Sequence, residues 1–124
     1  MHKLFIIIGS ISGMLSVMIG AFGAHALQAT LEANQRLETF ETAVKYQFYH
    51  SLALILLGLL MLHMQHKGFN IAGYSFIIGI LIFSGSLYAL SLTGFTKLGA
   101  ITPFGGLAFI IGWGSMIWGA YRVL

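Results

Sequence analysis

The stretch Tyr46-Gln47-Phe48-Tyr49-His50 marks the point where a charged segment of the chain changes into a long apolar one. Before it, residues 32–45 carry five charged side chains (Glu32, Arg36, Glu38, Glu41 and Lys45). After it, the run SLALILLGLLML at residues 51–62 carries none. Such a run is typical of a helix that spans a bilayer or fills a large core. His50 lies about one helical turn inside the apolar side, so it is the first residue to examine for function.

The overall composition indicates an integral membrane protein. Apolar residues make up 58% of the 124 residues and charged residues only 7%, whereas a soluble domain has about 25% charged residues. The net charge of +3 is too thinly spread for nucleic acid, which requires a clustered basic face. We therefore expect membrane lipids as partners and no nucleic acid. The lack of cysteine excludes disulfides and thiolate metal ligands.

Four apolar segments predict an all-α fold with four transmembrane helices in a single domain, residues 1–124. The run from Leu4 to Ala24 alone gives about 31 Å of helix, enough to cross the hydrocarbon. The Leu-rich second span is expected to face lipid more than the others, and the Ser-rich third to be buried. In the fourth, Thr102-Pro103 predicts a hydroxyl N-cap followed by proline at the first helical position. The expected spans are residues 4–25, 47–64, 71–92 and 102–121.

The polar segment between the first two spans predicts a surface amphipathic helix over residues 31–46. Its apolar side chains lie on one stripe, at Ala33, Leu37, Phe40 and Val44. The pairs Glu32–Arg36 and Glu41–Lys45 are spaced to support such a helix. The alternative interpretation is a helix packed on the end of the bundle.

Rows of small residues lie on one face of the first and last spans and predict close helix packing. The first row is Ser12, Ser16, Gly20 and Ala24, and the last span has Ala108, Gly112, Ser115 and Gly119. Four short helices enclose little interior, so these rows offer more packing surface than one bundle needs. We therefore expect a homo-oligomer.

Four spans place both termini on one side of a multi-pass protein of the cell membrane. The Lys/Arg count is tied, with Lys3, Lys67 and Arg122 on the terminal side and Arg36, Lys45 and Lys97 on the other. The positive-inside rule does not decide an equal count. The terminal amine, His2 and His66 favour cytoplasmic termini.

Four sequence blocks together resemble one known family. They are GAFGAHAL at 20–27, YQFYHSLAL at 46–54, FSGSLY at 83–88 and LGAITPFGG at 98–106. This combination is similar to the transmembrane protein 256 family, whose bacterial members are uncharacterised membrane proteins of a domain of unknown function. The resemblance covers essentially the whole chain. It implies a four-helix membrane fold and no catalytic residues.

The same blocks place polar residues at one membrane face, where antiparallel helices bring their ends together. We predict a polar pocket there, formed by His25, Tyr46, Tyr49, His50, Ser84, Tyr88 and Thr102. His50 has two interpretations: a neutral imidazole bonded to Tyr88 or to a backbone carbonyl, or a proton- or ligand-binding group. The other pocket residues also have structural alternatives. His25 would then be the capped end of a helix, Tyr46 and Tyr49 would be aromatic-belt anchors, and Ser84 would bond to its own helix.

The turn at Thr102–Gly106 is a candidate anion site. Its helix N-terminal N–H groups, beside Gly105 and Gly106, are placed to hold an anionic lipid head group. The alternative is that the two glycines only allow close packing. No metal site is predicted.

The function favoured by these residues is binding or assembly in the membrane, with a lipid or a partner protein as ligand. The alternative is a small-solute or proton-linked transporter or channel that uses His25 and His50. An enzyme is disfavoured because the chain has no Asp and no acidic residue to orient a Ser–His pair. No cofactor is predicted, although haem ligation by His25 and His50 is a further alternative.

Overall fold

The computed structural model describes residues 1–124, apart from the side chain of Ala24. Four helical runs are long and apolar enough to cross a membrane. They extend over His2–Gly23, Leu37–Leu60, Lys67–Thr93 and Thr96–Val123. The predicted fold class, an all-α protein with four transmembrane helices, is confirmed.

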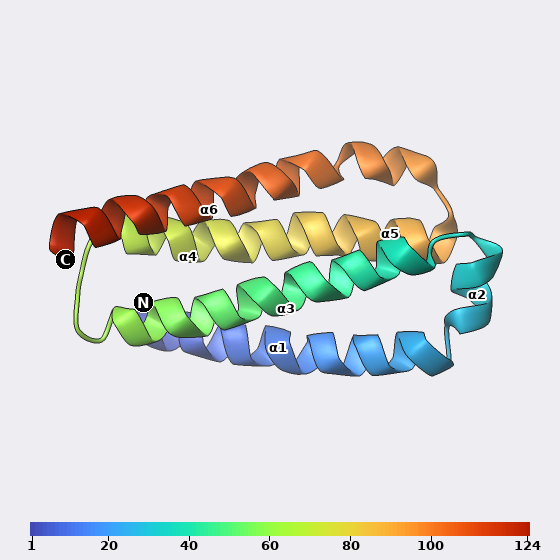
Figure 1. Ribbon diagram of the computed structural model, residues 1–124, viewed down its shortest axis with the longest axis horizontal. Coiled ribbons are helices and arrows are strands. Elements are labelled where there is room, and N and C mark those ends of the chain that lie inside the picture. Colours follow the sequence, from blue (N-terminus) through green and yellow to red (C-terminus); the bar gives the residue numbers. More distant parts are fainter.

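The four runs are built from five α-helices and two shorter helical turns, and a sixth helix, α2, lies between the first two runs. Helix α1 is His2–His25, the short α2 is Gln28–Ala33, and α3 is Leu37–Leu60. The third run consists of α4 (Lys67–Gly79), a π-helical turn η1 (Ile80–Ser84) and α5 (Gly85–Thr93). The fourth consists of a 3₁₀ turn η2 (Thr96–Ala100) and α6 (Thr102–Val123). Figure 1 shows both termini at the same end of the bundle, with α2 at the opposite end.

Two helix pairs form the bundle. Helix α1 packs along α3, and α6 packs along α4 and η1. Helix α3 joins the two pairs through its contacts with α4, η1 and α5. Near its start α1 also reaches α4, where the Phe5 and Tyr74 rings meet edge to face with centroids 5.4 Å apart. In Figure 1 the order across the molecule is α6, α4, α3 and α1.

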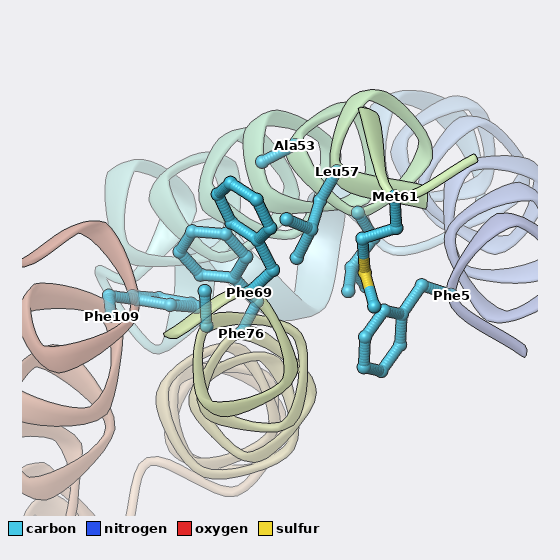
Figure 2. Close-up of a cluster of buried hydrophobic side chains, with 9 residues drawn as sticks. Phe5, Ala53, Leu57, Met61, Phe69, Phe76 and Phe109 are labelled. Atoms are coloured by element: carbon cyan, nitrogen blue, oxygen red, sulfur yellow. The ribbon is translucent and has the colours of Figure 1, made fainter. Parts of the chain in front are cut away.

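Phenylalanines fill the centre between the pairs. Figure 2 shows Phe5 of α1 and Phe109 of α6 pointing inward from opposite sides, with Phe69 and Phe76 of α4 between them. Several of these rings lie directly over glycines. A Cβ on Gly112 would lie 2.6 Å from the Phe76 ring, and one on Gly119 would lie 2.7 Å from the Phe69 ring. Gly112 and Gly119 of the predicted small-residue row therefore pack inside this chain.

The small-residue row of α1 is also used within the chain. A Cβ on Gly9 would lie 2.8 Å from the backbone oxygen of Ser51, and one on Gly20 would lie 3.2 Å from Val44, both on α3. Such close backbone approach is the usual role of small residues between membrane helices. The surface that motivated the homo-oligomer is thus largely occupied by intramolecular contacts.

The predicted surface helix 31–46 has the wrong boundaries. Helix α2 ends at Ala33, and the chain turns at Gln35, whose φ of 54° is left-handed. Residues from Leu37 onward belong to α3, which continues without a break into the span. The physical reason is that Phe40 and Ala43 are buried in phase with Gln47 and Leu54, so one contact face runs the whole length of α3. A short helix between the first two spans is present, but it is α2.

The second span is also more buried than expected. Its most apolar window has the largest buried share of the four spans, because α3 contacts helices on both sides. The prediction that it faces lipid most was wrong, whereas the Ser-rich third span is substantially buried, as expected.

Candidate functional site

The structure places the predicted pocket residues in three separate groups. His25 is exposed at the end of α1. His50 and Tyr46 lie on the side of α3 that faces η1 and α6. Tyr88 of α5 lies toward α1, where it bonds to Gln47. Residues that the sequence grouped by depth are therefore divided between different faces of α3.

His50 is buried, and both of its ring nitrogens have partners. The Trp113 Nε1–H donates to Nε2 over 3.1 Å, and Nδ1 lies 2.7 Å from the Tyr46 carbonyl oxygen. Because Nε2 accepts, the neutral ring must carry its hydrogen on Nδ1 and donate it to Tyr46. The ring also stacks on Phe109, with centroids 3.6 Å apart. His50 thus joins α3 to α6 through Trp113, whereas its carbonyl partner Tyr46 lies on α3 itself and Tyr88 bonds to Gln47 instead.

Two tyrosines extend this aromatic group toward the surface. The Tyr46 ring packs on Phe83 with centroids 4.7 Å apart and on Tyr49 with centroids 5.9 Å apart. Both tyrosines are substantially exposed, which is the position of membrane-interface anchors. Aromatic rings surround His50, so no open path leads from the surface to its imidazole.

A second polar group connects α1, α3 and α5. The Gln47 Nε2–H₂ group donates to the Ser12 carbonyl over 3.1 Å, and the Tyr88 hydroxyl donates to Gln47 Oε1 over 2.5 Å. The Ser51 hydroxyl lies 2.7 Å from Ser12 Oγ. Gln47 and Ser51 were not singled out from the sequence as site residues. The sequence feature that could have pointed to Gln47 is its polar amide side chain at the start of an uncharged membrane span.

The serines of the third span also bond to other helices. Ser84 Oγ donates to the Ala43 carbonyl of α3 over 2.8 Å. Ser86 Oγ and Thr102 Oγ1 lie 2.6 Å apart and connect α5 to α6. Thr102 is the first residue of α6 and not its N-cap, which is Ile101. The capping prediction was wrong because the η2 turn leads directly into α6, so the Thr102 hydroxyl is free to reach Ser86.

The glycines of the predicted anion turn serve as packing positions. A Cβ on Gly105 would lie 2.3 Å from the backbone nitrogen of Phe83 in η1, and one on Gly106 would lie 3.9 Å from the Phe83 ring. The Phe104 backbone N–H donates to the Ile101 carbonyl over 3.1 Å. The Phe83 main chain therefore fills the space beside Gly105 that a head group would need.

The haem alternative has little support from this geometry. His25 lies at the end of α1, whereas His50 is enclosed by rings and bonded at both nitrogens. An iron at His50 Nε2 would have to displace the Trp113 bond. Within the described residues there is no group of three or more His, Cys, Asp or Glu side chains that could hold a metal ion.

An apolar groove opens between α1 and the third helical run. Its wider part has a volume of about 370 Å³. A second hollow of about 210 Å³ lies next to it along α1, and we treat the two together. Leu15 of α1 lines both parts, and Tyr88 and Gln47 of the second polar group border it. We call this the α1–α5 groove. Its other lining residues are Ile8, Ile11, Ser12, Met18, Ile19, Phe22, Leu27, Phe40, Ile77, Ile80, Leu81 and Leu92.

Comparison with known proteins identifies the family. A family model described as "Protein of unknown function (DUF423)" matches residues 19–106. The chain is 46% identical to a UPF0382 membrane protein of Staphylococcus haemolyticus over 120 residues, which are 97% of each chain. It is 43% identical to the UPF0382 membrane protein YwdK of Bacillus subtilis over 123 residues, 98% of this chain and 99% of the relative. No solved structure matches the chain.

These matches confirm an uncharacterised bacterial family of membrane proteins, while the relation to the transmembrane protein 256 family stays a prediction. The family model covers more than half of the chain, and the relatives align over almost all of it. They carry the name of a membrane protein, in agreement with the four apolar helices. The chain therefore belongs to the DUF423 family and is a multi-pass membrane protein.

Proposed function

We propose that this protein binds a single membrane lipid, with one acyl chain held in the α1–α5 groove. The observation that carries the proposal is the groove itself, which runs along the helices and is lined almost entirely by apolar side chains. From Ile8 to Phe22 it follows α1 for about 21 Å at 1.5 Å per residue. One leaflet of a bilayer is about 15 Å of hydrocarbon, so the groove is long enough for an acyl chain.

The position of the groove favours a lipid over a partner helix. Its base is formed by Phe40 of α3, and its walls by α1 and α5, so the space is a narrow channel between helices. A transmembrane helix is about 10 Å across with its side chains and would require α1 to move away from α3. That movement would break the bonds from Ser12 to Gln47 and Ser51.

The interaction would depend on shape. In a bilayer the acyl chain is already surrounded by hydrocarbon, so van der Waals packing, and not transfer from water, must favour the groove. Polar atoms of Ser12, Gln47 and Tyr88 lie along the base, but they bond to one another. The chain would thus contact an apolar wall.

The test is the replacement Leu15→Trp, which fills the point where the two parts of the groove meet. Native mass spectrometry of protein released from mild detergent should show one retained lipid per wild-type chain and a loss of that lipid in Leu15→Trp. Met14→Trp is the matched control because Met14 is 57% exposed on the same helix and lines neither part of the groove. Equal lipid retention by both variants would contradict the proposal.

The proton-linked transporter has weaker support. It requires His25 and His50 to exchange protons along a path, but His50 is enclosed by Phe76, Phe109 and Trp113 and bonded at both nitrogens. A homo-oligomer stays a prediction, and it would have to use surfaces other than the glycine rows already packed within the chain.

Cytoplasmic termini also remain part of the proposal. Lys3, Lys67 and Arg122 at the end with both termini are matched by Arg36, Lys45 and Lys97 at the other end, so the support comes from the terminal amine, His2 and His66. Labelling of engineered cysteines at positions 2 and 123 on intact cells would decide the orientation. The expected result is that neither position reacts with an impermeant reagent until the membrane is opened.

A further inference from the structure

A polar hollow lies at the end of the bundle where the termini meet, away from the α1–α5 groove. Its volume is about 300 Å³. Four of the side chains that line it are polar, namely His2, Gln65, His66 and Asn70, and Met1 and Met61 complete the wall. We call this the terminal hollow. It is assembled from the start of α1, the end of the α3–α4 connection and the first turn of α4.

The two sides of the terminal hollow are held together. The Tyr74 hydroxyl of α4 donates to the Met1 sulfur over 3.1 Å. One turn further along α1, the buried Phe5 ring packs on the Tyr74 ring. These contacts fix the start of α1 against α4, so His2 stays near Asn70.

The hydrogen bond of His66 determines what the hollow can bind. His66 is the N-cap of α4, and its Nδ1 accepts the Gly68 backbone N–H over 2.9 Å. In the neutral ring the hydrogen must then be on Nε2, which makes this nitrogen a donor and not a metal ligand. The ring is kept in place by edge-to-face packing on Trp118, with centroids 4.7 Å apart. The hollow therefore suits an anion better than a cation.

The formal charges around the hollow have one sign. Lys3 and Lys67 directly follow the lining residues His2 and His66 in the chain, and the three Glu side chains lie at the opposite end of the bundle. The hollow itself is lined by Met, His, Gln and Asn side chains, and the lysines next to it in the chain give it the basic surroundings in which phosphate-bearing lipid head groups bind at the interface. The amides of Gln65 and Asn70 add neutral donors for phosphate oxygens.

From these observations we propose that the terminal hollow binds a phosphate group, with the His66 Nε2–H and the amides of Gln65 and Asn70 as donors. The phosphate can come from an anionic lipid at the membrane surface or from the aqueous phase. The site does not depend on an acyl chain in the α1–α5 groove, because it uses different residues at a different depth.

The experiment compares an anionic phospholipid, a zwitterionic phospholipid and free phosphate as ligands, on the wild type and one variant. Wild-type protein in mild detergent is titrated with phosphatidylglycerol, with phosphatidylcholine and with inorganic phosphate, and bound ligand is counted by native mass spectrometry. His66→Asn removes the Nε2 donor but keeps a side chain that can cap α4. His63→Asn is the control, since His63 lies in the same connection but does not line the hollow.

The expected result is that phosphatidylglycerol binds in preference to phosphatidylcholine and that His66→Asn weakens it about tenfold, the usual effect of losing one hydrogen bond to a charged group. The control His63→Asn should bind phosphatidylglycerol as the wild type does, and neither variant should change the unfolding temperature. If inorganic phosphate competes with phosphatidylglycerol, the site also takes phosphate from the aqueous phase. If inorganic phosphate binds and phosphatidylglycerol does not, the aqueous anion is the ligand. Equal binding of every probe by wild type and His66→Asn, or no binding of either phosphate source, would overturn the proposal.

Discussion

The interface between α1 and α3 and the interface between α4 and α6 hold their helices together by different means. Between α1 and α3 the central contacts are hydrogen bonds, from Gln47 and Ser51 to Ser12, with Gly9 set directly against the Ser51 backbone. Between α4 and α6, phenylalanine rings of α4 pack directly on glycines of α6. The Phe76 ring lies over Gly112 and the Phe69 ring over Gly119. The first interface is polar at its centre and the second is aromatic.

The difference reflects a property of the bilayer. Apolar helices gain little from leaving lipid for one another, so their association depends on polar bonds or on close packing. Each interface uses mainly one of these two. The polar bonds also determine where the α1–α5 groove lies, because they hold α1 against α3. The part of α1 that follows Phe5 in the chain is thereby left without close contact to α5.

The largest expected effect concerns Gly105 of α6, which lies against the main chain of η1. Gly105→Ala would place a Cβ 2.3 Å from the Phe83 backbone nitrogen, and a main-chain atom cannot move aside as a side chain can. We expect a loss of about 3 kcal/mol in the free energy of unfolding, at the upper end of overpacking costs. Steric-trap or mixed-micelle unfolding would measure it. Gly114→Ala is the control on the same helix, because its Cβ would meet nothing within 4 Å; equal stability of the two variants would refute the close contact.

The second prediction tests the polar interface. Gln47→Leu leaves the Tyr88 hydroxyl and Ser12 without their partner, and we expect a loss of about 1.5 kcal/mol, near the maximum found for hydrogen bonds between membrane helices. Tyr88→Phe added to Gln47→Leu should cost less than the sum of the two single changes, because both remove the same bond. Strictly additive losses in the unfolding free energy would show that the bond contributes nothing.

The third prediction concerns the bond from α3 to α6. His50→Leu leaves the Trp113 N–H without its acceptor, for an expected loss of about 1 kcal/mol. His50→Gln retains a neutral acceptor and should lose less than half of that. The fluorescence maximum of Trp113, in a variant with Trp118→Phe, should shift in the Leu variant only. Identical spectra and stabilities for Leu and Gln would mean that Trp113 does not use His50.

The number and order of the spans were predictable because a bilayer requires long apolar runs and the sequence has four of them. The surface helix was misplaced because hydropathy changes at Tyr46, whereas the helical contact face does not. The grouping of His50 with Tyr88 was not predictable from depth. His50 and Gln47 are one turn apart on α3, but one bonds to α6 and the other to α1 and α5, and sequence spacing alone does not give the rotation of a helix in its bundle.

The smallest expected effect distinguishes two roles for Thr102. If Thr102 acts as the partner of Ser86 between α5 and α6, Thr102→Val should lower the free energy of unfolding by about 0.5 kcal/mol, since the bond is partly exposed. Thr102→Asn separates the alternatives, because Asn is among the best N-caps. Unfolding of Thr102→Asn should resemble that of Thr102→Val; full retention of wild-type stability would instead support a capping role.

The central claim, a lipid chain in the α1–α5 groove, is tested most directly by a structure of the protein determined in a lipid nanodisc. We predict elongated density parallel to α1, in contact with Leu15, Met18 and Tyr88. A map in which α1 packs directly on α5 and closes the groove, or in which the groove is open but holds no ordered chain, would contradict the claim.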